Sequence, residues 1–176
     1  MDIVKEHREK CTYCGQCIEV CPRYEDLKLI ENLCKYLEGN SDIDSGSLFR
    51  CLTCGLCTYA CPEGLGIKPL ISPARQKWVN ENGLTDRQTM VDPDAENNIF
   101  TKIAEMDEIP VYKEGPGSVV YFPGCAGAYI NTSMAKAAVA LLEKAGVDYT
   151  VLNGIEYCCG AVSAGAGDPD PIRRNG

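Results

Sequence analysis

The chain has 176 residues, a formal net charge of -8 at pH 7 and a sequence pI of about 4.7. This length allows one ordinary domain or two small ones. The acidic balance argues against nucleic-acid binding, which needs a basic face. No apolar run approaches the roughly 18 residues that cross a bilayer, and the charged N-terminal segment lacks the apolar core of a signal peptide. We therefore expect a cytoplasmic protein without a membrane span, in a compartment that keeps thiols reduced.

A run of cysteines occurs twice with the same spacing, as CTYCGQCIEVCP at residues 11–22 and as CLTCGLCTYACP at residues 51–62. This spacing is the ligand run of bacterial ferredoxins, in which three thiolates hold one 4Fe-4S cluster and the fourth reaches the neighbouring cluster. We therefore predict two 4Fe-4S clusters with crossed ligation. The predicted ligands of the first cluster are Cys11, Cys14, Cys17 and Cys61. The predicted ligands of the second cluster are Cys51, Cys54, Cys57 and Cys21.

The same cysteines have two simpler interpretations. Cys-x-x-Cys pairs can hold zinc, and an even number of cysteines can form disulfides. Zinc gives no reason for a third cysteine at the next step or for Cys-Pro at the end of both runs. Disulfides need an oxidising compartment, for which the N-terminus carries no signal. A zinc scaffold would give a colourless preparation, whereas an iron-sulfur protein is brown.

The segment between the two runs is predicted to be an amphipathic helix. Apolar side chains recur at helical spacing at Leu27, Ile30, Leu33 and Leu37. Gly39 stands where such a helix would end. Cys34 lies beside the apolar stripe, so we interpret it as a core residue and not as a ligand. His7, the only histidine, lies in a charged stretch and is expected to be solvated.

Two more helices are predicted before the chain changes character. One begins at Ser72-Pro73 and ends at Gly83, and another begins at Asp92-Pro93-Asp94. The apolar stripe of the latter is Ile99, Phe100, Ile103 and Met106. Residues 1–106 are thus predicted to form an α-helical ferredoxin domain with two 4Fe-4S clusters. Residues 107–117 contain two Pro and two Gly and are predicted to be a linker.

Residues 118–176 have the pattern of a partial α/β domain. Residues 118–122 are predicted to be a buried strand that ends at Pro123-Gly124-Cys125, and residues 147–152 a second strand that leads to Cys158-Cys159-Gly160. Between them, Asn131, Thr132 or Ser133 caps a helix that Gly146 closes. Its predicted apolar face is Met134, Ala138, Leu141, Leu142 and Ala145. The predicted fold is therefore mostly α, an α-helical two-cluster domain followed by a βαβ unit.

The βαβ unit would place cysteines at the carboxyl ends of both strands, the edge where open α/β sheets bind ligands. We predict that Cys125, Cys158 and Cys159 form part of a cluster or metal site, because neighbouring thiolates can bind different irons of one cluster. The alternative is that these small thiols only pack beneath loops. No catalytic residue can be assigned from the sequence.

The chain resembles a family of iron-sulfur subunits. The triplets PGC at residues 123–125 and CCG at residues 158–160, after two ferredoxin runs, are similar to those of heterodisulfide reductase, glycolate oxidase, lactate utilisation and anaerobic glycerol-3-phosphate dehydrogenase systems. In that family a two-cluster α-helical domain precedes a cysteine-rich CCG domain. The family's CCG domain continues into a later Cys-x-x-Cys, whereas no cysteine follows Cys159 here. The resemblance therefore implies a fragment of a longer protein or completion by a partner chain. The poorly covered two-stranded sheet favours the fragment.

The resemblance also implies a function. We expect an electron-transfer subunit of a heterodisulfide-reductase-like oxidoreductase that relays electrons through two 4Fe-4S clusters to or from a CCG-domain site. A third cluster or metal would form there if missing or partner residues complete it. The expected partners are a flavoprotein or a further iron-sulfur subunit, through which the chain could associate with the cytoplasmic membrane face. The alternatives are a non-catalytic ferredoxin-like carrier, and the iron-sulfur subunit of a hydroxy-acid or glycerol-3-phosphate dehydrogenase complex.

Overall fold

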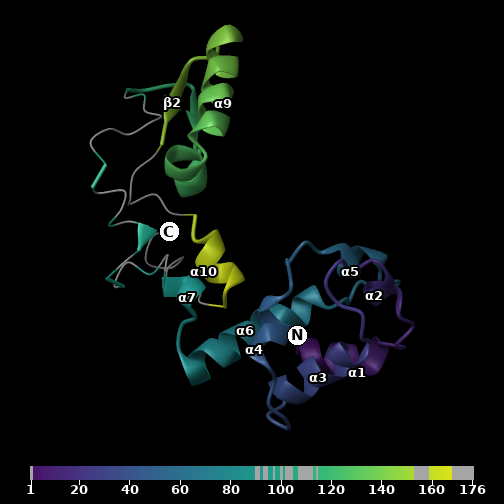
Figure 1. Cartoon of the computed structure of the whole chain (residues 1–176). Helices are drawn as coiled ribbons and strands as arrows, with labels where there is room; N and C mark the ends of the chain where they lie inside the picture. The colour runs from purple at the N-terminus through teal and green to yellow at the C-terminus, as the bar shows by residue number, and fades with distance from the viewer. Residues whose placement is uncertain are drawn as a thin grey trace. The chain divides into compact units, whose positions relative to one another are not determined.

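The computed structural model is mostly helical and contains one small parallel sheet, as predicted. It describes residues 2–89, 115–152 and 159–167, together with residues 92, 95, 96, 98, 99, 101, 105, 106 and 113. The chain divides into two compact units. The first consists of Met1–Thr85 with Val162–Pro169, and the second consists of Asp86–Ala161 with Asp170–Gly176 (Figure 1). The predicted boundaries at residues 106 and 117 stay a prediction, because the predicted linker lies largely outside the described residues.

The first unit is a set of short helices around the two cysteine runs. Its helices are α1 (Ile3–Lys10), α2 (Gln16–Glu19), α3 (Lys28–Leu37), α4 (Ser45–Phe49), α5 (Leu56–Ala60) and α6 (Lys68–Asn82). Helices α2 and α5 belong to the cysteine runs and contact each other, whereas α3 and α6 form the central helix pair. Helix α10 (Ala161–Gly165) also belongs to this unit, except for its first residue.

Helix α3 confirms the prediction for the segment between the runs. Leu33 and Cys34 are 0% and 1% exposed, so Cys34 is a core residue. Gly39 has a φ of +78°. The Gly39 N–H donates to the Tyr36 carbonyl at 3.0 Å and the Asn40 N–H donates to the Lys35 carbonyl at 2.9 Å. These bonds close the helix end with a left-handed glycine, as the sequence suggested.

Helix α6 begins earlier than predicted. It starts at Lys68, so Pro73 lies inside the helix and not at its first position. A proline inside a helix costs about 3 kcal/mol. Leu70 and Ile71 are both fully buried, and burying such side chains contributes about 1.5–3 kcal/mol each. Burial therefore outweighs the local signal. The predicted end at Gly83 is confirmed, with the Gly83 N–H bonded to the Val79 carbonyl at 2.8 Å.

The second unit contains the predicted βαβ arrangement. Its elements are α7 (Asp86–Thr89), β1 (Val119–Tyr121), η1 (Ala126–Ile130), α9 (Thr132–Lys144) and β2 (Tyr149–Val151). Strands β1 and β2 pair in parallel. Ser118 supports the pairing, because its hydroxyl donates to the Asp148 carbonyl at 2.8 Å. Of the predicted helix that begins at Asp92, residues 93, 94, 97, 100 and 102–104 lie outside the described residues.

Two details of the second unit differ from the prediction. Strand β1 is not buried, since Val119 and Val120 are 43% and 58% exposed. The buried face of α9 is centred on Ala135, which packs with Tyr149 and Val151 and is flanked by partly buried side chains including Val139 and Leu142. The predicted face members Met134 and Leu141 are 56% and 69% exposed. The apolar pattern of α9 fits two faces, and contact with β2 selects the one that carries small Ala135.

Across the described part of the chain, no helix combines the length and the apolar character needed to cross a membrane.

Candidate iron-sulfur sites

Two pockets lie among the cysteine loops of the first unit. The first pocket encloses about 410 Å³, including its open mouth, and its lining thiols are Cys11, Cys14, Cys17 and Cys61. The second pocket encloses about 340 Å³, and its lining thiols are Cys21, Cys51, Cys54 and Cys57. Each pocket therefore contains three thiols from one run and the fourth thiol of the other. The structure brings together the same two sets of residues that the spacing grouped.

The backbone of the two loops is alike at two equivalent positions. The residue before the second cysteine is left-handed in both runs, with φ of 55° at Tyr13 and 54° at Thr53. The glycine after that cysteine is also left-handed, with φ of 88° at Gly15 and 82° at Gly55. A side chain in this region is strained, and such strain is concentrated at functional sites. The loops therefore adopt a shape that local propensity alone does not favour.

The innermost thiol of each run is buried in the shared core. Cys17 and Cys57 are each 7% exposed and belong to the same hydrophobic cluster, so the two pockets are neighbours. Burial, and then the nearby thiols of Cys11 and other cysteines, raise the pKa of Cys17 to about 11. Burial also raises the pKa of Cys51. Both thiols must lose a proton to act as metal ligands, so metal binding here would release protons.

Backbone N–H groups point at the sulfur atoms of the second pocket. The Thr53 N–H donates to Cys51 Sγ at 3.3 Å. The Ile67 and Lys68 N–H groups donate to Cys57 Sγ at 3.3 and 3.4 Å. Such bonds draw negative charge away from a thiolate, which is one of the ways in which a protein adjusts the potential of a cluster.

Gly66 and His7 hold the segment that supplies two of these donors. A Cβ at Gly66 would lie 2.5 Å from the Thr58 nitrogen, so only glycine allows the close approach of this segment to α5. The His7 ring contacts the Gly66 carbonyl through Nε2 at 2.8 Å and the Ile3 carbonyl through Nδ1 at 2.9 Å. His7 is 1% exposed, so the expectation of a solvated histidine was wrong. Either ring nitrogen can donate to a backbone carbonyl when it carries the proton, which explains how this polar ring can be buried.

Arg75 is a buried cation that the sequence analysis missed. It is 5% exposed and donates to the carbonyls of Leu48, at 2.9 and 3.0 Å, Cys51, at 2.7 Å, and Gly165. Burial lowers its pKa. Among the described residues no carboxylate pairs with it. A buried guanidinium behind Cys51 fits a site for an anionic group. Its position four residues after Ile71, on the buried face of α6, is the signal that could have revealed it.

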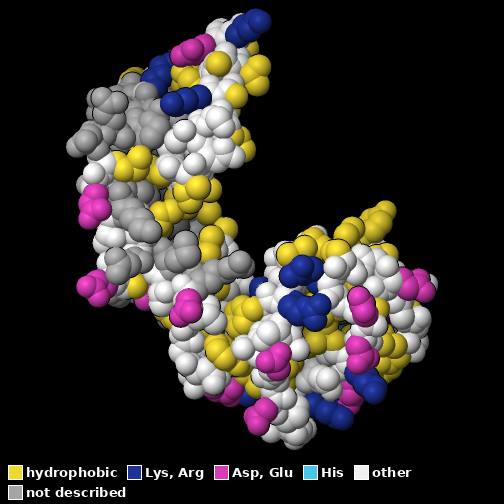
Figure 2. Space-filling model, viewed as in Figure 1, with side chains coloured by type: hydrophobic (Ala, Val, Ile, Leu, Met, Phe, Trp, Pro, Cys, Tyr) yellow, Lys and Arg dark blue, Asp and Glu magenta, His cyan; other side chains and the backbone are white. Residues whose placement is uncertain are grey.

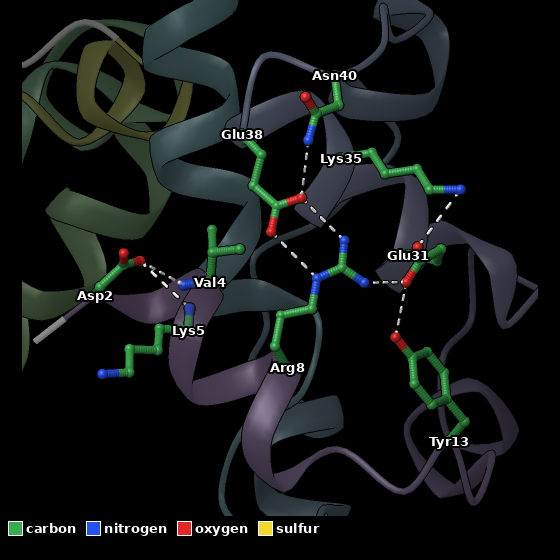
Figure 3. A network of polar contacts seen from close by, with 9 residues as sticks. All are labelled: Asp2, Val4, Lys5, Arg8, Tyr13, Glu31, Lys35, Glu38 and Asn40. Carbon is green, nitrogen blue, oxygen red and sulfur yellow. Dashed lines mark hydrogen bonds and ion pairs between the residues drawn. The ribbon is translucent and has the colours of Figure 1, made fainter.

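The loop of the first run is held by a surface ionic network (Figure 3). The Tyr13 hydroxyl donates to Glu31 Oε2 at 2.9 Å, and Arg8 forms an ion pair with the same carboxylate. Arg8 also contacts both carboxylate oxygens of Glu38, at 3.2 and 3.0 Å. Tyr13 and Arg8 lower the pKa of Glu31. The network joins α1, α3 and the left-handed residue of the first loop.

The third group of cysteines is only partly described. Cys125 is half-buried at the N-cap of the π-helix η1, just after β1, and π-helical turns are frequent at functional sites. Cys159 is exposed, and Cys158 lies outside the described residues. Within the described ranges, no group of three or more His, Cys, Asp or Glu residues is arranged to hold a single metal ion. Ligation by these three cysteines stays a prediction.

Comparison with known proteins identifies two domains. Residues 7–65 match the 4Fe-4S dicluster domain family, and residues 119–174 match the cysteine-rich domain family. The chain is similar to a subunit of dihydromethanophenazine:CoB--CoM heterodisulfide reductase from Methanosarcina mazei, with 25% identity over 87% of this chain and 46% of the relative. The equivalent protein of Methanosarcina acetivorans is 23% identical over the same shares. An uncharacterized iron-sulfur protein of Methanococcus maripaludis is 22% identical over 91% of this chain and 36% of the relative.

No solved structure matches the chain. The chain spans less than half the length of these curated relatives. The order of the two matched domains is the order that the cysteine motifs predicted. The chain is therefore an iron-sulfur protein of the predicted type, in which a 4Fe-4S dicluster domain precedes a cysteine-rich domain, and it is homologous to a subunit of heterodisulfide reductase.

Proposed function

We propose that the chain relays electrons through two 4Fe-4S clusters to or from a site in its cysteine-rich domain, within a heterodisulfide-reductase-like oxidoreductase. The proposed ligands of the first cluster are Cys11, Cys14, Cys17 and Cys61. The proposed ligands of the second cluster are Cys51, Cys54, Cys57 and Cys21. The redox partners are proposed to be a flavoprotein or a further iron-sulfur subunit, and the proposed location is the cytoplasm.

The crossed arrangement of thiols carries this proposal. A fourth thiol that comes from the other run is expected for two adjacent clusters, and each pocket has one. The residues around the pockets fit such a group, because they offer backbone N–H donors to sulfur and a buried cation with no carboxylate partner among the described residues. A bound cluster would supply a one-electron redox centre. The chain would hold it by thiolate ligation and exclude water through the core around Cys17 and Cys57.

Paired substitutions test the crossed ligation. The full chain, reconstituted anaerobically, should contain about eight irons. Cys14→Ser with Cys61→Ser removes two ligands of one proposed cluster, so about four irons should remain. Cys54→Ser with Cys61→Ser removes one ligand from each cluster and should remove most of the iron. Cys34→Ala is the matched control and should keep the full content. If the second pair retained one intact cluster and the first pair lost both, the ligands would not be crossed.

The electrons are proposed to pass from the two clusters to a site that contains Cys125, Cys158 and Cys159. These thiols would supply part of a third cluster that further residues complete. In the assembled complex, Cys158→Ser should remove an electron paramagnetic resonance signal distinct from those of the two ferredoxin-type clusters. Unchanged spectra and unchanged iron content would instead favour the non-catalytic carrier.

A further inference from the structure

The internal repeat allows the surfaces of the two cysteine runs to be compared position by position. The runs are offset by 40 residues, and three exposed positions differ in character. In the first run these positions are polar: Thr12, Gln16 and Glu19. In the second run they are apolar and 59%, 48% and 92% exposed: Leu52, Leu56 and Tyr59. Because the first run has polar residues there and the same left-handed loop residues, the loop does not require apolar side chains at these positions.

The charges beside the two runs also differ. Arg23 and Glu63 occupy equivalent positions after each Cys-Pro, and the crossing brings Arg23 to the second pocket and Glu63 to the first. Lys68 also lines the second pocket, and among its described lining residues there is no Asp or Glu. Arg23 Nε also donates to the backbone carbonyl of Arg50 at 3.3 Å. The second pocket therefore has a basic rim.

These residues form one surface, which we call the second-run face. Its members are Leu52, Leu56, Tyr59, Arg23 and Lys68. Figure 2 shows hydrophobic side chains projecting over α5, with Lys and Arg side chains beside them. Exposed apolar groups inside a polar rim are typical of protein interaction sites, and tyrosine and arginine are frequent anchors there.

We propose that the second-run face docks an electron-transfer protein whose contact surface is apolar at its centre and acidic at its rim. This inference rests on the proposed function. Leu52 and Leu56 line the second pocket and Cys54 is exposed, so a docked partner would lie directly against the second cluster site. One electron passes from the partner's reduced cofactor to that site. The partner is thereby oxidised by one electron, and no bond or proton is exchanged.

The sign of the salt dependence distinguishes this local attraction from the net charge. The chain carries a net charge of -8, so an acidic partner would be repelled if overall charge controlled the encounter. Rising salt lowers the association rate if local attraction controls the encounter, and raises it if overall repulsion does. The probe is a reduced plant-type 2Fe-2S ferredoxin, an acidic one-electron carrier. With the full reconstituted chain in stopped flow, the second-order rate should fall at least tenfold between low and high salt. A rate that rises with salt would overturn the proposal.

Variants that copy the first run test the face without requiring a new fold. Leu52→Thr with Leu56→Gln should reduce the low-salt rate several-fold, and Arg23→Glu should remove most of its salt dependence. Thr12→Leu with Gln16→Leu is the reciprocal control and should leave the rate unchanged. Iron and sulfide content must match the wild type in each variant. A reconstituted wild-type chain without clusters would refute the proposed function. Intact clusters with unchanged rates in the second-run variants would refute only the docking proposal.

A zero-length carbodiimide cross-link maps the contact independently of electron transfer. It should join Lys68 to a carboxylate of the oxidised ferredoxin probe, and Lys5 on α1 should react far less. Coupling at Lys5 but not at Lys68 would contradict the assignment. Self-association of the wild-type chain that Leu52→Thr with Leu56→Gln abolishes would assign the face to a second copy, and would also overturn the proposal.

Discussion

The two cysteine runs have the same spacing and the same left-handed loop residues, but their surroundings differ. The first loop is supported from the surface, through Tyr13, Glu31 and Arg8. The second loop is supported from the interior, through Gly66 packed on α5 and through Arg75 bonded to the Cys51 carbonyl. The spacing of the cysteines thus determines which thiols line each pocket. The neighbouring helices determine how rigid each pocket is and which charges surround it. We expect the second pocket to be the more rigid and the more electropositive of the two.

The largest expected effect comes from filling the close contact beneath the second loop. Gly66→Ala adds a Cβ at a left-handed residue and against the Thr58 nitrogen, so the loop must move. We expect a loss of about 2–4 kcal/mol in the free energy of unfolding. Both clusters should be weakened, because Gly66 lines the first pocket and packs against α5 of the second run. Gly64→Ala is the matched control, because its φ is +67° and nothing lies within 4 Å of the added Cβ. Equal losses for both variants in chemical denaturation would contradict the packing argument.

The next effect concerns the buried cation. Arg75→Met keeps most of the side-chain volume and removes the charge behind Cys51. We expect the second cluster to become harder to reduce, by roughly 60 mV, which is a tenfold change for a one-electron couple. The first cluster should change much less. Redox titration followed by electron paramagnetic resonance measures both. Because three carbonyls also lose their donor, Arg75→Lys serves as a control that retains the charge. Equal shifts at both clusters would show that the two pockets share one electrostatic environment.

The next prediction concerns the pH dependence of stability, which should depend on the buried thiol of Cys34. Burial raises the pKa of Cys34 from 9.0 to about 11. Its neutral thiol therefore contributes stability that is fully present below pH 9 and is lost as the pH rises through 11. We expect this contribution to be at most about 2 kcal/mol. Melting temperatures of the loaded wild type and of Cys34→Ala should converge between pH 9 and pH 11. Parallel curves would mean that the pKa of Cys34 is the same in the folded and the unfolded chain.

The smallest effect is expected from the surface network of the first loop. Arg8→Met breaks the ion pairs with Glu31 and Glu38, which are about one-third exposed. Exposed ion pairs contribute little and are screened by salt. The melting temperature should therefore fall slightly at low salt and match the wild type at high salt, with both clusters retained. Loss of the first cluster in this variant would show that the network is needed to form the loop and not only to support it.

The sequence by itself predicted the two groups of four thiols that line the pockets and the order of the two domains. It could do so because the spacing within each run and the strand-helix alternation are local patterns, and the repeat of the run indicates two adjacent sites. It also predicted α3 with its left-handed end at Gly39, since that helix has one unambiguous apolar stripe.

Only the tertiary structure decided the features that depend on contacts between distant segments. It extended α6 across Pro73, selected the Ala135 face of α9 and buried His7 against Gly66. It also placed Arg75 behind Cys51 and gave the second run its basic rim. Each of these outcomes depends on the free energy of packing two segments that lie far apart in the chain, and no local pattern encodes that energy.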